Sequence, residues 1–420
     1  MSKSFCMAPW VHANVEPTGI VRMCCIAQGE QMGNINEEPI NDIWNGERYK
    51  TIRLKMINDE PVPECRRCIA EESWGNTNSM RSMFNTMYKD KEHLVEETKE
   101  DGSLETMELI RWDFRFSNLC NLACIGCSPA YSSTWGPIAA KLYAYKGDQF
   151  MTGKDRMDVF ITTIGEHVHH VRDVYFAGGE PLIQPEHYQI LEKLDEANRL
   201  EDVDFCYSTN LTTIKFKSTS VFEYWKKMKK LRLLISLDEV TPERLHYIRY
   251  PSKLDTLYEH IKLVKEELTT PEKSYSITPT WGILNTHRIK EFMEWIVEND
   301  LLPNSYADSL NWEYDFHNII LLDPEHLSVG AASPEWKFHL HNKINEYYVW
   351  YQKELISRKR EDLRAEAKRV LKRDMLRFHA AIDRKANFSQ EKWMYWIKKL
   401  DDIRGTKFLD IFPELSWHYQ

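Results

Sequence analysis

Short β-rich runs alternate with longer amphipathic segments from about Glu108 to Leu322. Six runs have the length and composition of strands, and the stretches between them show the apolar spacing of helices. Strands that alternate with helices form βα units around a parallel sheet, so the predicted fold class is α/β. The predicted strands are Leu109–Phe116, Val171–Ala177, Val203–Thr209, Leu231–Leu237, Tyr275–Leu284 and Trp312–Leu322.

Polar and apolar residues alternate within several of these strands. In the first strand Trp112 and Phe114 share one face, and Arg111, Asp113 and Arg115 share the other. We expect the apolar face to pack on helices and the polar face to line an interior. Structural ion pairs or solvated strand ends are the alternative, because buried charges need partners whatever their role.

The segments on either side predict further domains. A helix is expected over Pro39–Met56, and the charged stretch Lys89–Gly102 is typical of a linker. Glu335–Asp401 predicts two or three helices, with an aromatic stripe that includes Phe338 and Tyr347 in their core. The predicted organisation is a cysteine-rich module at 1–75, a linker at 76–107, a barrel at 108–322 and a helical region at 323–420.

Composition indicates a globular protein with a large core. Hydrophobic residues make up 42% of the 420 residues and charged residues 28%. No apolar run approaches the roughly 18 residues of a membrane span, and Met1–Cys6 does not resemble a signal peptide. The nine cysteines are bunched, which favours metal ligation over disulfides. We therefore expect a cytoplasmic protein.

The charge pattern predicts no nucleic-acid partner. The formal net charge is -9. Within the basic stretch Lys353–Arg377, acidic residues recur at helical spacing, which favours a solvated helix face over a nucleic-acid patch.

Three cysteines within eight residues carry the strongest chemical signal. Cys120, Cys124 and Cys127 place three thiolates on one loop, which suits a cubane iron–sulfur cluster with one iron left open. A zinc site or buried free thiols are the alternatives, although a zinc site normally closes with a fourth ligand.

This C-x3-C-x2-C spacing after a strand resembles the radical S-adenosylmethionine (SAM) superfamily. Leu119, Asn121 and Leu122 match the family, whereas Gly126 replaces its usual aromatic residue beside the adenine. The resemblance implies a partial (β/α)6 TIM-type barrel and a [4Fe-4S] cluster on the three cysteines. In this family the open iron binds SAM, and electron transfer cleaves SAM to a 5′-deoxyadenosyl radical.

A second group, Cys6, Cys24, Cys65 and Cys68, supplies enough thiolates to close a cluster completely. Its surroundings resemble the twitch module, a shortened SPASM domain, and imply one auxiliary [4Fe-4S] cluster; this module generally follows the barrel and here precedes it. A zinc ribbon is the alternative. Neighbouring strand residues point to opposite faces, so we expect Cys25 to be a bystander.

The ends of the later strands resemble the SAM contacts of the family. Gly178-Gly179-Glu180-Pro181 matches the Gly-Gly-Glu-Pro motif that holds the amino group of SAM. The resemblance further implies that residues at the ends of the other strands contact the ribose, the carboxylate and the adenine side of SAM. Ser208 and Asn210 are candidate SAM-binding residues in a motif that resembles Thr-Asn-Gly but has Leu211 in place of glycine. The other candidate SAM-binding residues are Ser236, Asp238, Arg249 for the SAM carboxylate and Asn285 near the adenine.

The predicted function is that of a radical SAM enzyme. The resemblance implies a low-potential donor, flavodoxin or ferredoxin, and hydrogen abstraction from an unidentified small molecule or peptide, with the auxiliary cluster transferring electrons. A noncatalytic two-cluster electron-transfer protein and a zinc-scaffolded binding protein are the alternatives. Cys206 is either a hydrogen-atom donor in the lumen or an inert buried thiol.

Overall fold

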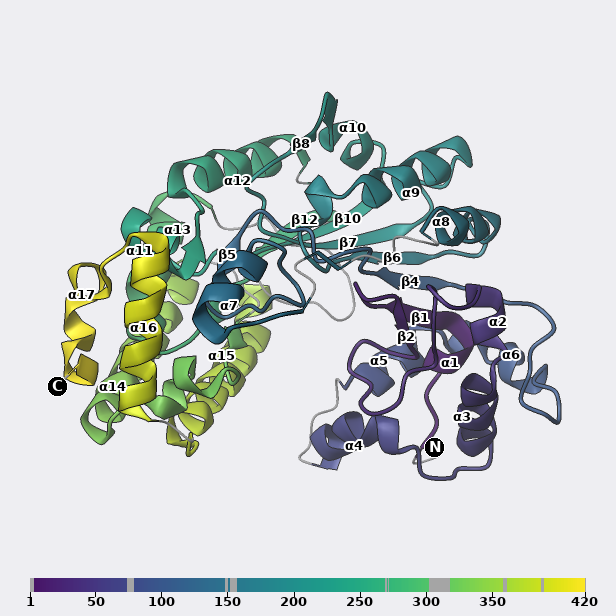
Figure 1. The fold of residues 1–420 in the computed structure, drawn as a ribbon, viewed down its shortest axis with the longest axis horizontal. Coiled ribbons are helices and arrows are strands. Elements are labelled where there is room, and N and C mark those ends of the chain that lie inside the picture. The colour runs from purple at the N-terminus through teal and green to yellow at the C-terminus, as the bar shows by residue number, and fades with distance from the viewer. Residues whose placement is uncertain are drawn as a thin grey trace. The chain divides into compact units, whose positions relative to one another are not determined.

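The computed structural model describes residues 4–73, 79–147, 150–151, 157–268, 270, 272–301, 318–357, 361–386 and 389–419, with the backbone alone at 355–357, 361–370 and 417–419. The chain divides into two compact units, whose elements are labelled in Figure 1. The first unit comprises Met1–Cys120, Phe150–Thr209 and Ile214–Arg232. The second comprises Asn121–Gln149, Asn210–Thr213 and Leu233–Gln420.

Parallel strands form the centre of the first unit. The strand order is β1 (His12–Val15), β4 (Arg111–Phe114), β6 (Asp173–Phe176) and β7 (Asp204–Thr209), each parallel to its neighbour. On the other side of β1, β2 (Ile20–Arg22) and β3 (Gly33–Asn34) continue the sheet with antiparallel pairing. The N-terminal cysteine-rich segment therefore shares a sheet with strands of the predicted barrel.

Helices α8 (Met157–Glu166) and α9 (Pro185–Glu196) cover one face of this sheet. The Phe160 ring meets that of Phe114 edge-on at 5.0 Å, and the His187 ring meets that of Phe176 at 4.6 Å. These contacts bury the apolar face that the strand pattern predicts. The other helices and the small hairpin of this unit are α1 (Ala8–Val11), α2 (Ile40–Trp44), α3 (Glu47–Ile57), α4 (Arg66–Ser73), α5 (Met80–Met87), α6 (His93–Glu96), α10 (Phe222–Trp225), β8 (Lys215–Phe216) and β9 (Thr219–Ser220).

Two predictions for the N-terminal region differ from the structure. The single helix over Pro39–Met56 is wrong: Gly46 is extended and separates α2 from α3. Asn45 exchanges two hydrogen bonds, of 2.8 and 3.0 Å, with the backbone of Leu104, which holds the break. The segment predicted as a linker contains α5 and α6, because Tyr88 and Leu94 are buried there.

The second unit combines short strands with long helices. Strand β10 (Lys230–Ile235) begins in the first unit and ends in the second, and β12 (Lys273–Ile277) follows it. The predicted strand Tyr275–Leu284 is interrupted because Pro279, which has no N–H, separates β12 from β13 (Thr280–Trp281). The other elements are β5 (Ala123–Cys124), α7 (Trp135–Tyr143), α11 (Pro242–Ile248), β11 (Arg249–Tyr250), α12 (Leu254–Leu268), α13 (Ile289–Glu298), β14 (Ile319–Ile320), α14 (Pro334–Ser357), α15 (Glu361–Asp383), α16 (Gln390–Arg404) and α17 (Phe408–Ile411).

Helices separate the successive longer strands β4, β6, β7, β10 and β12, which confirms the predicted α/β class. Residues 312–317 of the sixth predicted strand lie outside the described residues, and β14 occupies part of the remainder. Three long helices, α14, α15 and α16, confirm the predicted helical C-terminal region (Figure 1). Among the described residues, no helix has the length and apolarity that crossing a membrane requires.

Side-chain burial in the C-terminal region departs from the pattern at one position. Tyr347 is buried as predicted, but Phe338 is 70% exposed. At about 100° per residue, Phe338 lies roughly 120° around α14 from the buried Ile344, and so outside its apolar stripe. Side chains at 355–370 of the basic stretch lie outside the described residues.

Candidate active site

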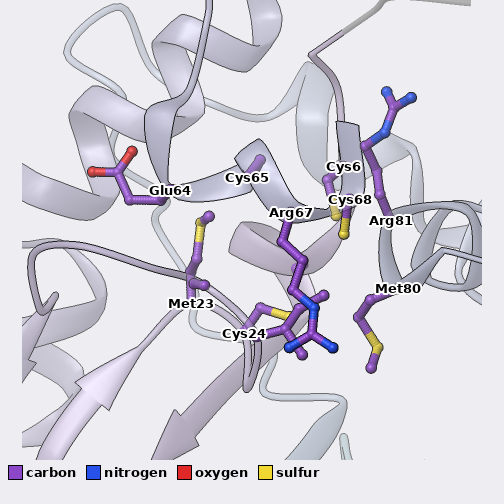
Figure 2. Close-up of a pocket in the computed structure, with 12 residues that line it drawn as sticks. Cys6, Met23, Cys24, Glu64, Cys65, Arg67, Cys68, Met80 and Arg81 are labelled. Carbon is purple, nitrogen blue, oxygen red and sulfur yellow. The ribbon is translucent and has the colours of Figure 1, made fainter. Parts of the chain in front are cut away.

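Four cysteines from separate segments of the first unit line one pocket. Cys6 precedes α1, Cys24 follows β2, Cys65 ends a 3-10 helix, and Cys68 lies in α4. Figure 2 shows these four residues around the pocket, with Arg81 among the other lining residues. They are the four cysteines predicted to hold the auxiliary cluster.

Local hydrogen bonds bring these segments together. A turn at Gly19, where φ is +84°, reverses the chain between β1 and β2, and the Glu16 N–H donates to the Ile20 carbonyl at 2.8 Å. This hairpin carries Cys24 back toward Cys6. The Asn85 amide of α5 fixes the other side, since it accepts from the Met7 N–H at 2.8 Å and donates to the Phe5 carbonyl at 3.1 Å.

Burial and hydrogen bonding set the protonation of the four thiols. Burial raises the pKa of Cys6, of Cys68 and of Cys65, the last to about 12. A hydrogen bond with Cys25 and then burial raise the pKa of Cys24. Such thiols stay protonated at neutral pH unless a bound cation displaces the proton. Among the described residues, no three His, Cys, Asp or Glu side chains are arranged to hold one metal ion.

Cys25 has different surroundings from Cys24. It is absent from the pocket lining, and its charged neighbours are Asp113, Arg115 and Arg111 of the sheet. The hydrogen bond with Cys24 lowers the pKa of Cys25, against the effect of burial. The two adjacent thiols thus have different surroundings, although both follow the end of β2 at Arg22 and lie in a turn rather than on a strand.

The three-cysteine loop is held by the strands and helix that follow it. Cys120 ends the first long segment of the first unit, and Cys124 and Cys127 belong to the second unit. In the second unit β5 pairs with β11, which sets Arg249 opposite Cys124. The Trp135 indole N–H donates to the Cys124 carbonyl at 2.7 Å. Arg249 and Cys124, which are predicted from motifs far apart in the sequence, are therefore neighbours.

The three cysteines of this loop are partly buried. Burial raises the pKa of Cys124 and raises that of Cys127 to about 12. The positive charges of Arg249 and Arg404 oppose this effect at Cys124. At Gly126 an added Cβ would lie 3.3 Å from the Leu321 side chain, so a neighbour occupies the space beside this glycine.

The Gly-Gly-Glu-Pro segment packs on the residues that precede Cys120. An added Cβ at Gly179 would lie 2.1 Å from the Leu119 carbonyl oxygen, so this position excludes any side chain. The Glu180 N–H donates to the same carbonyl at 2.7 Å. The Glu180 carboxylate is 1% exposed and accepts from the Thr209 hydroxyl at 2.7 Å. Pro181 begins the next 3-10 helix.

The third strand ends in a strained turn. Leu211 has φ of +49°, a conformation that favours glycine, at the position where the motif normally has glycine. The Asn210 carboxamide donates to Asn121 at 3.0 Å and accepts from the Thr212 N–H at 3.0 Å. Ser208, on β7, shares a 2.7 Å hydrogen bond with Tyr175.

Three predicted SAM-site residues form one network in the second unit. Asp238 accepts from the Arg249 guanidinium at 2.9 Å and from the Thr280 N–H at 2.7 Å. Asn285 donates to the Asp238 carbonyl at 2.7 Å. Ser236, at the end of β10, is partly exposed. The network presents one guanidinium, Arg249, beside Cys124.

Sequence reasoning missed Arg404 of α16. Its guanidinium donates to the Ala123 carbonyl at 2.6 Å and to the Tyr247 carbonyl at 3.0 Å. The cation also lies over the rings of Trp135 and Tyr250, at 5.3 and 4.8 Å from their centroids. No motif marks this arginine, since it is an ordinary last-turn cation before a helix-ending glycine.

Two family models match the segments that contain the two cysteine groups. The model of the iron–sulfur cluster-binding domain SPASM matches residues 6–69, and that of the radical SAM superfamily matches residues 114–296. The first match covers all four cysteines of the pocket, and the second covers the three-cysteine loop and the strands that follow.

Two curated proteins are similar over part of the chain. GTP 3′,8-cyclase of Streptomyces coelicolor is 24% identical over 199 residues, which are 47% of this chain and 53% of the relative. GTP 3′,8-cyclase of Peptoclostridium acidaminophilum is 24% identical over 43% of this chain and 50% of the relative. The chain therefore spans about half the length of the curated relatives it matches.

Solved structures are similar at lower identity. The native anSMEcpe structure with bound AdoMet and Cp18Cys peptide is 15% identical, covers 59% of this chain and 60% of that chain, and has a TM-score of 0.37. Streptococcus suis SuiB is 16% identical, covers 69% of this chain and 59% of that chain, and has a TM-score of 0.30.

Proposed function

Because this chain belongs to the radical SAM superfamily and carries a SPASM iron–sulfur domain at residues 6–69, we propose that it cleaves SAM reductively and abstracts hydrogen from a substrate held against the polar face of its sheet. The observation that carries the proposal is the pairing of β5 with β11, which sets Arg249 opposite Cys124. A guanidinium at this position suits the carboxylate of a bound amino acid.

Different residues of the proposed site bind different groups of SAM. Cys120, Cys124 and Cys127 hold a [4Fe-4S] cluster with one open iron. Arg249, oriented by Asp238, binds the SAM carboxylate, and Glu180 binds the SAM ammonium. Ser208, Asn210, Ser236 and Asn285 face the nucleoside, and Gly178 and Gly179 let the loop that carries Glu180 pack closely on Arg115 and Leu119. The bound cluster supplies the electron that cleaves SAM to a 5′-deoxyadenosyl radical.

The N-terminal cysteines serve electron transfer in this proposal. Cys6, Cys24, Cys65 and Cys68 would hold an auxiliary [4Fe-4S] cluster, which when bound would supply electron-transfer chemistry. Flavodoxin or ferredoxin supplies the low-potential electron. The substrate is a small molecule or a peptide, and GTP belongs among the first compounds to be tested because both curated relatives are GTP 3′,8-cyclases.

The test is anaerobic reconstitution followed by addition of SAM and dithionite. We expect 5′-deoxyadenosine from the wild-type chain and none from the triple variant Cys120→Ala, Cys124→Ala, Cys127→Ala. That variant should keep one cluster visible by EPR, because the other four cysteines lie in a separate pocket. Loss of all iron in the triple variant would contradict separate sites, and 5′-deoxyadenosine from it would contradict the assignment of the loop.

A further inference from the structure

Polar side chains lie in register across one face of the first unit's sheet. Asn14, Asp113, Tyr175 and Cys206 are opposite one another on β1, β4, β6 and β7. Alternation along β4 places Arg115 on the same face, one step toward the carboxyl ends of the strands. Parallel sheets usually bury apolar residues on both faces, so this polar row indicates a ligand surface rather than a second helix layer.

Three arginines and two buried carboxylates of the first unit lie at this face, and Arg115 pairs with Asp113 at 3.4 Å. Arg111, Arg115 and Arg232 stand against the buried carboxylates of Asp113 and Asp173, which are 2% and 9% exposed. Cys206 has Arg232, Arg111 and both of these carboxylates as its charged neighbours, which places Arg232 at the row. Toward the amino ends of the strands, Asp204 and Lys230 form an ion pair of their own at 2.9 Å.

Two arginines at this face are partly accessible, although Asn14 and Asp113 of the row are as buried as the apolar face. Arg115 retains 20% of its side-chain surface, and Arg232 and Cys206 are half-buried. Trp112 and Phe114, on the opposite face of the same strand, are 0% and 2% exposed. A guanidinium presents parallel N–H donors that match the two oxygens of a carboxylate or phosphate.

Arg115 also lies between two parts of the proposed machinery. A Cβ at Gly178 would lie 3.0 Å from the Arg115 Cβ, so the Gly-Gly-Glu-Pro loop packs against this arginine. Arg115 is also a charged neighbour of Cys25, which adjoins the pocket residue Cys24. We infer that the substrate carries an oxyanion, a carboxylate or a phosphate, which Arg115 and Arg232 hold over the row of Tyr175 and Cys206. This inference rests on the proposed function.

The experiment measures anion binding by the reconstituted full-length protein. Inorganic pyrophosphate and succinate are titrated separately by calorimetry at constant ionic strength, with sodium chloride as the reference. We expect at least one of them to bind the wild type, and Arg115→Gln and Arg232→Gln each to weaken that binding at least about tenfold. Pyrophosphate binding alone indicates a phosphate-bearing substrate, and succinate binding alone a carboxylate.

Two further variants separate recognition from charge and folding. Lys230→Gln makes the same charge change on the same strand at a residue whose side chain is 56% exposed, and should alter affinity less than about twofold. Arg115→Lys keeps the positive charge but lacks the parallel N–H donors of a guanidinium, so it should bind the anion with intermediate affinity. The inference is overturned if neither anion binds above the chloride reference, or if Lys230→Gln weakens binding as much as Arg232→Gln.

Wild-type SAM cleavage, measured in parallel, separates this inference from the proposed function. Formation of 5′-deoxyadenosine without anion binding overturns the inference alone. Anion binding without SAM cleavage overturns the proposed function and leaves an anion site on the sheet.

Discussion

Glu180 is a buried carboxylate whose proposed role is to bind the ammonium group of SAM. Replacing it with Gln exchanges a charge-assisted hydrogen bond for a neutral one, a loss of about 1 kcal/mol or roughly fivefold in SAM affinity. Cluster content should not change, because Glu180 accepts from Thr209 and the Leu182 N–H rather than from a cysteine. Equilibrium dialysis with labelled SAM measures the effect, beside the exposed control Glu192→Gln. SAM affinity equal to that of the wild type would remove Glu180 from the site.

Adjacent Cys24 and Cys25 offer a direct test of ligand assignment. Cys24 lines the pocket with three other cysteines, and Cys25 faces charged residues of the sheet. On a background without Cys120, Cys124 and Cys127, we expect Cys24→Ala to lose the remaining iron and sulfide and Cys25→Ala to retain them. The reverse result would exchange the two roles. Retention in both variants would mean that the N-terminal module binds its metal in another way.

At the scale of elements, Glu414 links the C-terminal segment to the rest of the second unit. Arg244 donates to it at 3.0 Å, and His287 lies 2.8 Å from it. Burial alone would raise the pKa of Glu414, but hydrogen bonds from His287 and Arg244 lower it overall. The folded pKa therefore lies below the unfolded value of about 4.3, and the stabilisation is fully present above that pH and is lost as the pH falls below it.

We expect Glu414→Gln to lower the free energy of unfolding by about 1–2 kcal/mol at pH 7, and by less near pH 3. Thermal unfolding at both pH values measures this difference. Glu266→Gln, at an exposed position of α12, is the matched control and should change stability by less than about 0.5 kcal/mol. An equal loss for Glu414→Gln at both pH values would contradict an ionic role for the carboxylate.

Sequence reasoning succeeds where a local pattern determines the structure. Strand alternation at Arg111–Arg115 predicts both faces of β4. At Gly179 the motif predicts close approach of a ligand, whereas the structure shows the Leu119 carbonyl beside this glycine. Sequence reasoning fails where a contact with a residue distant in sequence determines the structure. Leu104 stabilises the helix break at Asn45, which helical periodicity alone does not reveal. Phe338 has the residue type of a core position but lies outside the buried stripe of α14.

At the scale of the whole molecule, one side chain joins segments 281 positions apart. Arg404, near the end of α16, donates to the Ala123 carbonyl one residue before Cys124, and its side chain is buried. Helix α16 thus supports the loop that is proposed to hold the SAM-binding cluster. No pattern near either segment predicts this contact, because carbonyl groups carry no sequence signature.

Arg404→Met should therefore destabilise the three-cysteine loop while sparing the N-terminal pocket. Methionine fills much of the volume but cannot donate to the carbonyls of Ala123 and Tyr247, a loss of about 3 kcal/mol for two charge-assisted hydrogen bonds. We expect faster loss of the SAM-binding cluster on warming, followed by EPR and iron content, while the auxiliary cluster persists. Lys398→Met, at an exposed position of the same helix, is the control and should lose both clusters at wild-type rates. Equal loss of both clusters in Arg404→Met would indicate general destabilisation, and wild-type behaviour would mean that the loop holds its shape without α16.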